Sequence, residues 1–157
     1  MLRDEQHDNL VLTTKEYGQL QELVKILSPF AAATYSTQGS KKTVTISCVI
    51  PIILSLNKYL GFPLLAPSTF TNFVKTHLQS LHDRFAGIFT LLGVALPYNT
   101  TSSPDFHFNS SVVLMAAALD PAYGFNWIQD QSGSEEDKEA LKYKITGLYF
   151  SCFLKIS

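Results

Sequence analysis

The apolar residues recur at three- and four-residue steps in several long segments, which is the spacing of one helix face. At the start of the first segment, Thr13 and Glu16 form a capping box. We therefore predict a helix from there to about Ser36. Pro29 removes the hydrogen bond to the Lys25 carbonyl, which predicts either a bend or a boundary. The stripe expected to face a core comprises Tyr17, Leu20, Val24, Leu27, Ala31 and Thr34.

The next segment carries two patterns. Residues 44–48 alternate apolar and polar side chains, as a strand does, whereas residues 49–59 are apolar almost all round, as in a buried helix. We favour a helix that starts near Ser47, with Pro51 close to its first turn. Gly61 and the proline that follows at position 63 are typical helix terminators.

A second long helix is predicted after Ser68, ended by Gly93 and Pro97. It is followed by a loop over residues 97–110, which are rich in Ser, Thr, Asn and Pro. The stripe of this helix comprises Phe70, Val74, Leu78, Leu81, Phe85, Ile88 and Leu92.

Residues 111–121 are the stretch around which the chain is expected to be organised. An apolar run predicts a short buried helix, and the alanines at 116–118 allow other elements to approach its backbone closely. The run ends at Asp120, which we expect to cap a further helix that begins at Pro121 and ends at about Ile128.

The last helix begins at a second capping box, formed by Ser134 and Asp137, and its first turn is acidic. Its stripe comprises Leu141, Ile145, Leu148 and Cys152. Together the segments predict an all-α fold, with a polar leader at residues 1–11 and one helical domain at 12–157. Because the last segment is apolar to its end, we expect the chain to stop inside a larger ancestral fold.

Apolar residues make up 46% of the chain and charged residues only 16%. Either much of the chain is buried, or part of its surface covers another protein or a missing portion of its parent. The net charge of −1 argues against binding dominated by nucleic-acid phosphates. No apolar signal region and no run of roughly 20 apolar residues is present, so we expect no membrane span and an intracellular location, nuclear or cytoplasmic. Cys48 and Cys152 are then expected to be reduced core thiols.

The residues that carry chemistry do not form a recognisable constellation. His77 and His82 point about 140° apart around a helix, which disfavours a shared metal, and we interpret His82, Asp83 and Arg84 as a solvated face. Asp83, Asp105 and Asp120 are interpreted as surface, loop and capping residues rather than as a metal-binding set. We therefore predict no catalytic residue, no metal site and no cofactor. Tyr123 and Trp127 follow the Asp-Pro turn and either anchor the packing or contact a partner.

Four stretches together resemble hAT-type transposases. The segment 27–34, with Pro29, Phe30 and Thr34, is similar to that family's L-x-P-F-x-x-A-T. Residues 47–60 resemble the helix that follows it, and Arg84-Phe85 resembles an R-F pair that precedes a variable loop. Residues 115–123 resemble A-x-x-L-D-P-R-F/Y, through Leu119, Asp120 and Pro121. The order and spacing are similar over roughly residues 12–150, and most similar to the C-terminal region of domesticated, BED-type zinc-finger proteins.

This resemblance implies an all-helical segment of the kind inserted in an RNase H-like domain. In that family two catalytic aspartates precede the segment and a glutamate follows it; no position here matches them, and the BED finger is absent. Ala122 and Gly124 stand where the family usually has basic residues, which weakens an inherited role in nucleic-acid binding. The low charge, the apolar surplus and the missing catalytic residues favour a non-catalytic, transposase-derived module that acts through protein contacts, with another protein or its own copy. The alternative is a nuclear, DNA-associated transcriptional regulator without its finger. Residual nuclease activity and a marginally stable fragment are the weaker hypotheses.

Overall fold

The computed structural model describes residues 11–38, 46–61, 69–94, 96, 111–129 and 134–153, and all regular elements in these ranges are helices. The predicted all-α class is therefore confirmed for this part of the chain. The predicted leader (apart from Val11) and the predicted loop at 97–110 lie outside the described residues, and so does the side chain of Cys152.

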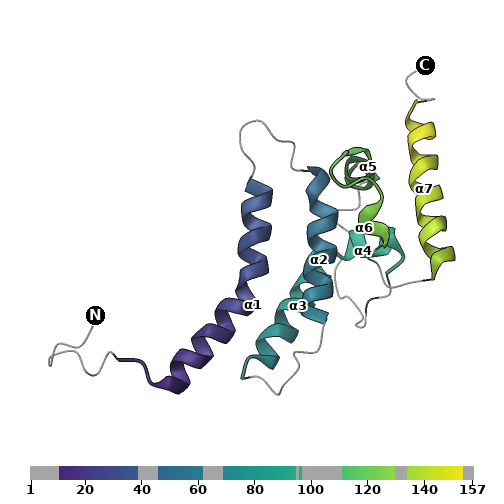
Figure 1. Ribbon diagram of the computed structural model, residues 1–157. Coiled ribbons are helices and arrows are strands. Elements are labelled where there is room, and N and C mark those ends of the chain that lie inside the picture. Colours follow the sequence, from purple (N-terminus) through teal and green to yellow (C-terminus); the bar gives the residue numbers. More distant parts are fainter. Residues whose placement is uncertain are drawn as a thin grey trace.

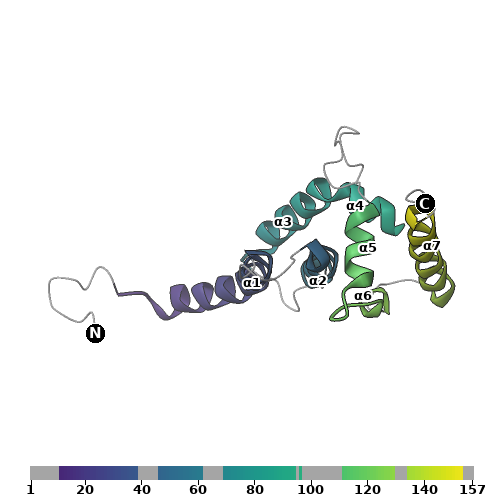
Figure 2. The same ribbon diagram turned by 90° about the horizontal axis from the view of Figure 1, so that it is seen from above.

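The helices are arranged in a row, with α1 (Thr14–Gln38) at one edge and α7 (Glu135–Phe153) at the other (Figure 1). Between them lie α2 (Val49–Gly61) and its preceding 3₁₀ turn η2 (Ile46–Cys48), together with α3 (Thr71–Arg84). The α4 (Ala86–Leu92), α5 (Ser111–Leu119) and α6 (Asn126–Gln129) helices lie between these and α7. Seen from above, α2 is viewed end-on and α5 runs across it (Figure 2).

The first helix starts where its capping box predicts. The Thr13 backbone N–H and hydroxyl each donate to Glu16 Oε2 at 2.8 Å, and the Glu16 N–H donates back to Thr13 Oγ1. The helix continues through Pro29 to Gln38 and changes direction along its length, so the proline bends it and does not divide it (Figure 1).

The predicted core-facing stripe of α1 is wrong, because all six of its residues are exposed. A second set at the same spacing, rotated around the helix, faces α2 and α3 instead. Ile26 is buried there, with Leu23, Phe30 and Ala33 partly buried around it. Two apolar stripes share one helix, and periodicity alone does not say which one the rest of the chain covers.

The second segment is helical, as favoured over a strand. Ile46–Cys48 forms the 3₁₀ turn and α2 follows, with Pro51 in its first turn, where a missing N–H costs no hydrogen bond. Its apolar residues are buried on two sides, as the nearly continuous apolar pattern predicts; the buried ones are Ile50, Ile53, Leu54, Leu56 and Leu60.

The predicted second long helix is wrong in one respect, because it is two helices. The chain leaves helical geometry at Phe85, with φ −112° and ψ 22°, and α4 begins at the next residue. All seven predicted stripe residues are nevertheless buried or partly buried. Gly93 then ends α4 in the left-handed region, at φ 71°, where glycine has no Cβ to clash.

The predicted buried helix at 111–119 is confirmed as α5, with Leu114 and Ala117 fully buried. The helix predicted from Pro121 to Ile128 is wrong: residues 121–125 are turns and only Asn126–Gln129 is helical. Gly124 adopts φ 52°, which breaks a right-handed helix at this point. Asp120 therefore holds a turn and does not cap a helix.

The last helix begins at the predicted capping box. The Ser134 hydroxyl donates to Asp137 Oδ2 at 2.7 Å, and the Asp137 N–H donates to Ser134 Oγ at 3.2 Å. Ile145 is fully buried, with Leu141 and Leu148 partly buried, so the predicted stripe is confirmed for its described members.

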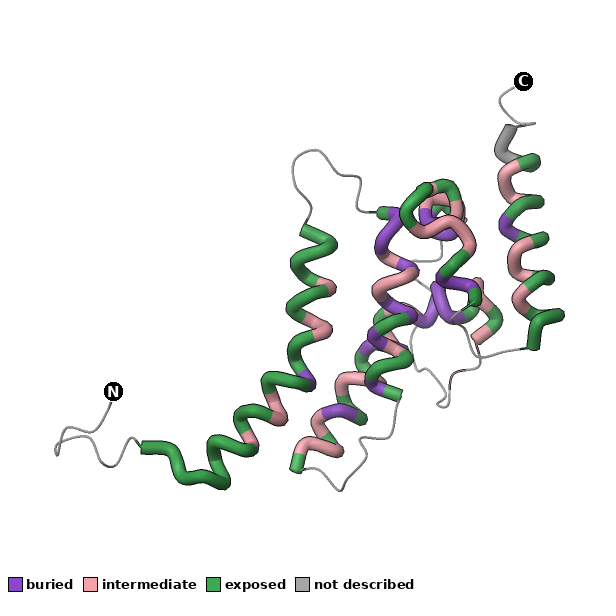
Figure 3. Tube along the Cα trace, viewed as in Figure 1, coloured by how far each residue is buried: buried purple, intermediate pink, exposed green. Residues whose placement is uncertain are grey.

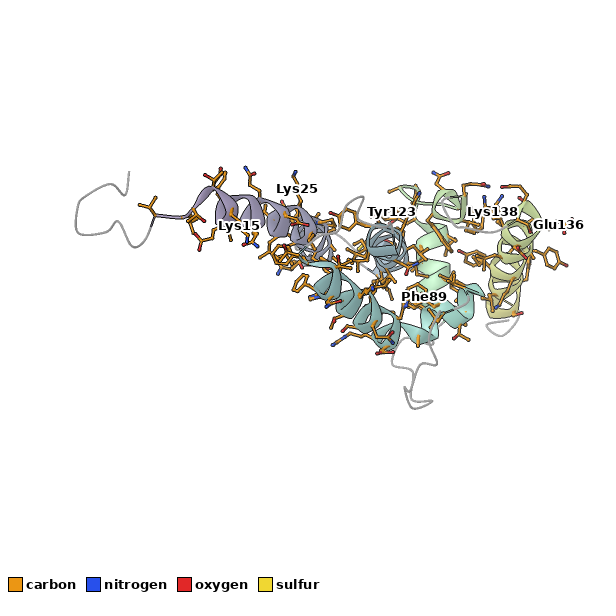
Figure 4. The ribbon with its side chains drawn as sticks, turned by 90° about the horizontal axis from the view of Figure 1, so that it is seen from below. Lys15, Lys25, Phe89, Tyr123, Glu136 and Lys138 are labelled. Atoms are coloured by element: carbon orange, nitrogen blue, oxygen red, sulfur yellow. The ribbon has the colours of Figure 1, made fainter. Side chains whose placement is uncertain are left out.

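The buried residues form two clusters. The larger one joins α2, α4, α5, α6 and α7 around Phe89 and Leu114, both 0% exposed; Figure 4 shows Phe89 in the interior. The smaller one joins α1, α2 and α3 around Ile26. The side chain of Phe85 packs against both clusters, so the α3–α4 break connects them.

Candidate functional site: the motif residues and the exposed face of α1

Asp120 joins the turn after α5 to the start of α2. Its Oδ2 accepts a 2.5 Å hydrogen bond from the Ser47 hydroxyl, and its Oδ1 accepts a 2.9 Å bond from the Ala122 N–H. The Ser47 hydroxyl, followed by that backbone N–H, lowers the pKa of the Asp120 carboxyl. Ser47 and Asp120 belong to two different stretches of the transposase resemblance, and the fold brings these stretches together.

Cys48, next to this contact, is buried and not in a disulfide, as predicted. Burial raises the pKa of its thiol, with a smaller contribution from the Asp120 charge. Its Sγ lies 3.8 Å from the Ser36 carbonyl oxygen, near the C-terminal end of α1. The thiol is thus kept in its protonated form and has the features of a structural cysteine rather than of a nucleophile.

Pro29 marks a second contact between helices. The proline has no N–H to donate to the Lys25 carbonyl, and the Tyr59 hydroxyl of α2 donates to that oxygen instead, at 2.9 Å. A defect inside α1 is therefore repaired by a side chain from α2. The sequence predicted the freed carbonyl and gave no signal for the donor.

The two other motif residues of α1 are held locally. Phe30 packs in the smaller cluster and meets the His77 ring edge-on, with centroids 5.9 Å apart. Thr34 is exposed and its hydroxyl donates to the Phe30 carbonyl at 2.9 Å. Neither residue faces a shared site with Asp120.

The interpretation of residues 82–84 as a solvated face is wrong for His82, which is buried with 4% exposure. Its Nε2 donates to Asn57 Oδ1 at 2.6 Å, and its ring meets Phe89 edge-on at 5.2 Å. Burial lowers the pKa of His82, an effect partly opposed by the Asp83 charge. Arg84 is exposed, whereas its motif neighbour Phe85 packs inside.

The residues near the Asp-Pro turn divide in the same way. Leu119 and Pro121 are exposed, whereas Trp127 is buried with 5% exposure. Tyr123 is half-buried against the larger cluster, and burial raises the pKa of its phenol. Of the two residues predicted as packing anchors or partner contacts, Trp127 is a packing anchor.

The polar side chains described above make contacts within the fold. In the described part of the chain, no group of three or more His, Cys, Asp or Glu residues lies close enough to hold a metal ion. Ser47, in η2, is bound to Asp120, whereas His82 contacts Asn57 of α2. Asn57 follows Ser47 by ten residues, so the two contacts are roughly 15 Å apart along the helix axis.

Among the described residues, more large apolar side chains are exposed on α1 than on any other helix, and we call the outward face that carries them the α1 stripe. Its side chains are apolar or aromatic and recur at helical spacing. Several of them expose more than half of their area, with Val24 at 66% and Tyr35 at 85%. Figure 3 shows α1 as mainly exposed along its length. The α1 stripe comprises Tyr17, Leu20, Val24, Leu27, Ala31 and Tyr35.

The comparisons with known proteins do not name a family. The chain matches no protein-family model, no curated protein and no solved structure. The resemblance to hAT-type transposases therefore stays a prediction. Among the described residues, none of the helices combines the length and the apolar character needed to cross a bilayer.

Proposed function

We propose that this chain is a non-catalytic, transposase-derived helical domain that acts as a protein-interaction module, in the nucleus or the cytoplasm. The α1 stripe carries the proposal. It presents five large apolar side chains on a helix whose opposite face is already covered by α2 and α3. Exposed apolar surface of this kind is typical of protein-binding sites.

Three of the motif residues support the same view, because they secure the fold. Asp120 binds Ser47, Pro29 leaves a carbonyl for Tyr59, and Phe85 connects the two clusters. Residues used for joining helices are not available for substrates. The α1 stripe takes no part in these contacts and stays exposed.

The alternative, a DNA-associated nuclear regulator, finds less support in the charges. The lysines of α7 are engaged: Lys138 and Lys142 pair with Glu135 and Glu139, and Lys144 donates to the Leu91 carbonyl. Lys15 and Lys25 lie on α1 at one edge, with Glu136 and Lys138 on α7 at the other (Figure 4). These lysines of α1 and α7, at opposite edges of the described residues, do not share one basic face of the kind that phosphate binding uses.

The test is site-specific photo-crosslinking in cells. A photoreactive amino acid at position 24, in the centre of the α1 stripe, is expected to give a discrete crosslinked protein species. The matched control carries the same residue at position 32, which is exposed on α1 outside the stripe. Equal crosslinking at both positions would contradict the proposal, and retention on duplex DNA that weakens steeply with salt would favour the alternative.

A further inference from the structure

We infer that the α1 stripe binds a second copy of this chain, forming a two-fold symmetric dimer through paired α1 helices. This inference rests on the proposed function and names its partner. The α1 helix lies at the edge of the row of helices, so a second molecule can approach it without displacing α2 or α3 (Figure 2). Two-fold dimers, in which the same surface serves on both sides, are the commonest oligomers.

The exposed area favours a second copy over a smaller occupant. With roughly 150–250 Å² for a complete aromatic side chain, the exposed fractions of Tyr17 (58%) and Tyr35 (85%) amount to about 200–350 Å². The three exposed aliphatic side chains Leu20, Val24 and Leu27 raise this to the order of 500 Å². Pairing two such faces buries about 1,000 Å², which is the size from which specific interfaces are found.

The distribution of charge favours self-pairing as well. All six residues of the α1 stripe are uncharged, so a two-fold axis across it brings no like charges together at its centre. The four charged residues of α1, two lysines and two glutamates, cancel and lie outside the stripe. A membrane-surface helix would instead carry a surplus of lysine or arginine on its polar face.

The sizes of the side chains also suit an antiparallel pair. Val24 lies midway between Tyr17 and Ala31, seven residues from each. A two-fold axis at Val24 therefore places the large Tyr17 of one copy opposite the small Ala31 of the other, at both ends of the contact. Large side chains opposite small ones allow two helices to approach closely.

The first experiment measures the association of the complete chain by sedimentation velocity over a wide range of concentration. The unchanged chain is expected to form dimers. Val24→Glu places an unpaired charge in the contact and should weaken dimerisation by about 100-fold or more. Ala32→Glu adds the same charge outside the stripe and should leave the dimer intact. Circular dichroism establishes that both variants keep their helices.

The second experiment reads the geometry and uses Cys152→Ser as its background. A cysteine introduced at position 24, on the expected axis, should form a disulfide between two copies on mild oxidation, whereas one introduced at position 32 should not. This background keeps Cys48, which is buried. A chain that sediments as a monomer at all concentrations overturns the inference. The proposed function then still stands if the photoreactive residue at position 24 captures a different protein, and it fails with the inference if nothing is captured.

Discussion

The helices α1 and α5 are both rich in apolar residues, yet they hold opposite places in the molecule. In α5 the residues Val113, Leu114 and Ala117 are buried in the larger cluster. In α1 the only buried residue is Ile26, and most of the helix is exposed (Figure 3). A helix needs only one covered face to be stable. A second apolar face is therefore not needed for folding and is available to bind a partner.

The largest expected effect is in α5, where Leu114→Ala should cost about 2–5 kcal/mol of unfolding free energy, because it empties a fully buried site. Leu119→Ala on the same helix is the matched control. The Leu119 side chain is 67% exposed, and its loss should change stability by no more than about 0.5 kcal/mol. Urea unfolding followed by circular dichroism measures both, and equal losses would abolish the contrast.

The next effect concerns the contact between Ser47 and Asp120. Ser47→Ala should lower the unfolding midpoint by less than Leu114→Ala does, because it removes one hydrogen bond to a carboxylate and creates little empty volume. The lowered pKa of Asp120 gives this contact a pH dependence. Its contribution is present above the ordinary value of 3.8 and is lost as the pH falls through the lower folded-state pKa.

The difference in midpoint between Ser47→Ala and the unchanged chain should therefore shrink in strong acid. Ser151→Ala is the matched control, since its exposed hydroxyl donates only to the Gly147 carbonyl within α7. A Ser47→Ala effect that stays constant from neutral to strongly acidic pH would show that the carboxylate does not contribute.

A smaller effect should come from the titration of His82. Because burial lowers its folded-state pKa, the unfolded chain takes up a proton at His82 first as the pH falls through its ordinary value of 6.5. The free energy of unfolding should therefore decrease as the pH drops below 6.5, and above 6.5 the contribution of neutral His82 should be fully present. In His82→Gln this part of the pH dependence should be missing, as measured by urea unfolding on both sides of pH 6.5, whereas His77→Gln should retain it.

The smallest effect is at the edge, where α1 meets α2. Tyr59→Phe removes the hydrogen bond to the Lys25 carbonyl and should cost about 0.5–1.5 kcal/mol. In a Pro29→Ala background the backbone N–H of residue 29 returns and bonds that carbonyl itself, so the same tyrosine change should cost less. A double-mutant cycle measures the coupling. Strictly additive costs would mean that the hydroxyl does not compensate for the proline.

The helices themselves could be predicted because their signals are local. The capping boxes at Thr13 and Ser134, the terminator Gly93 and the continuous apolar run of α2 each act within a few residues. Of the two errors in helix boundaries, the one at Gly124 has a local cause and the one at Phe85 does not. Phe85 carries no sequence signal for a break, and the left-handed Gly124 outweighs the helix start that Asp120 and Pro121 suggest.

The surfaces and contacts could be predicted less well because they depend on distant residues. Which stripe of α1 is covered follows from where α2 and α3 lie, and the burial of His82 follows from Asn57 and Phe89. The local sequence predicts a helix cap at Asp120, whereas its hydrogen-bond partner Ser47 lies 73 residues away. Spacing along the chain contains no information about such partners.

The carbonyl that Pro29 leaves open has a further consequence for how α1 and α2 are aligned lengthwise. Every turn of a regular helix offers its neighbour the same saturated backbone, so the backbone alone does not distinguish alignments that differ by one turn, about 5.4 Å. The free oxygen of Lys25 occurs at one height on α1, and the Tyr59 hydroxyl reaches it only when the helices are in one alignment. The hydrogen bond between Tyr59 and the carbonyl that Pro29 leaves open thus fixes the longitudinal position of α1 relative to α2.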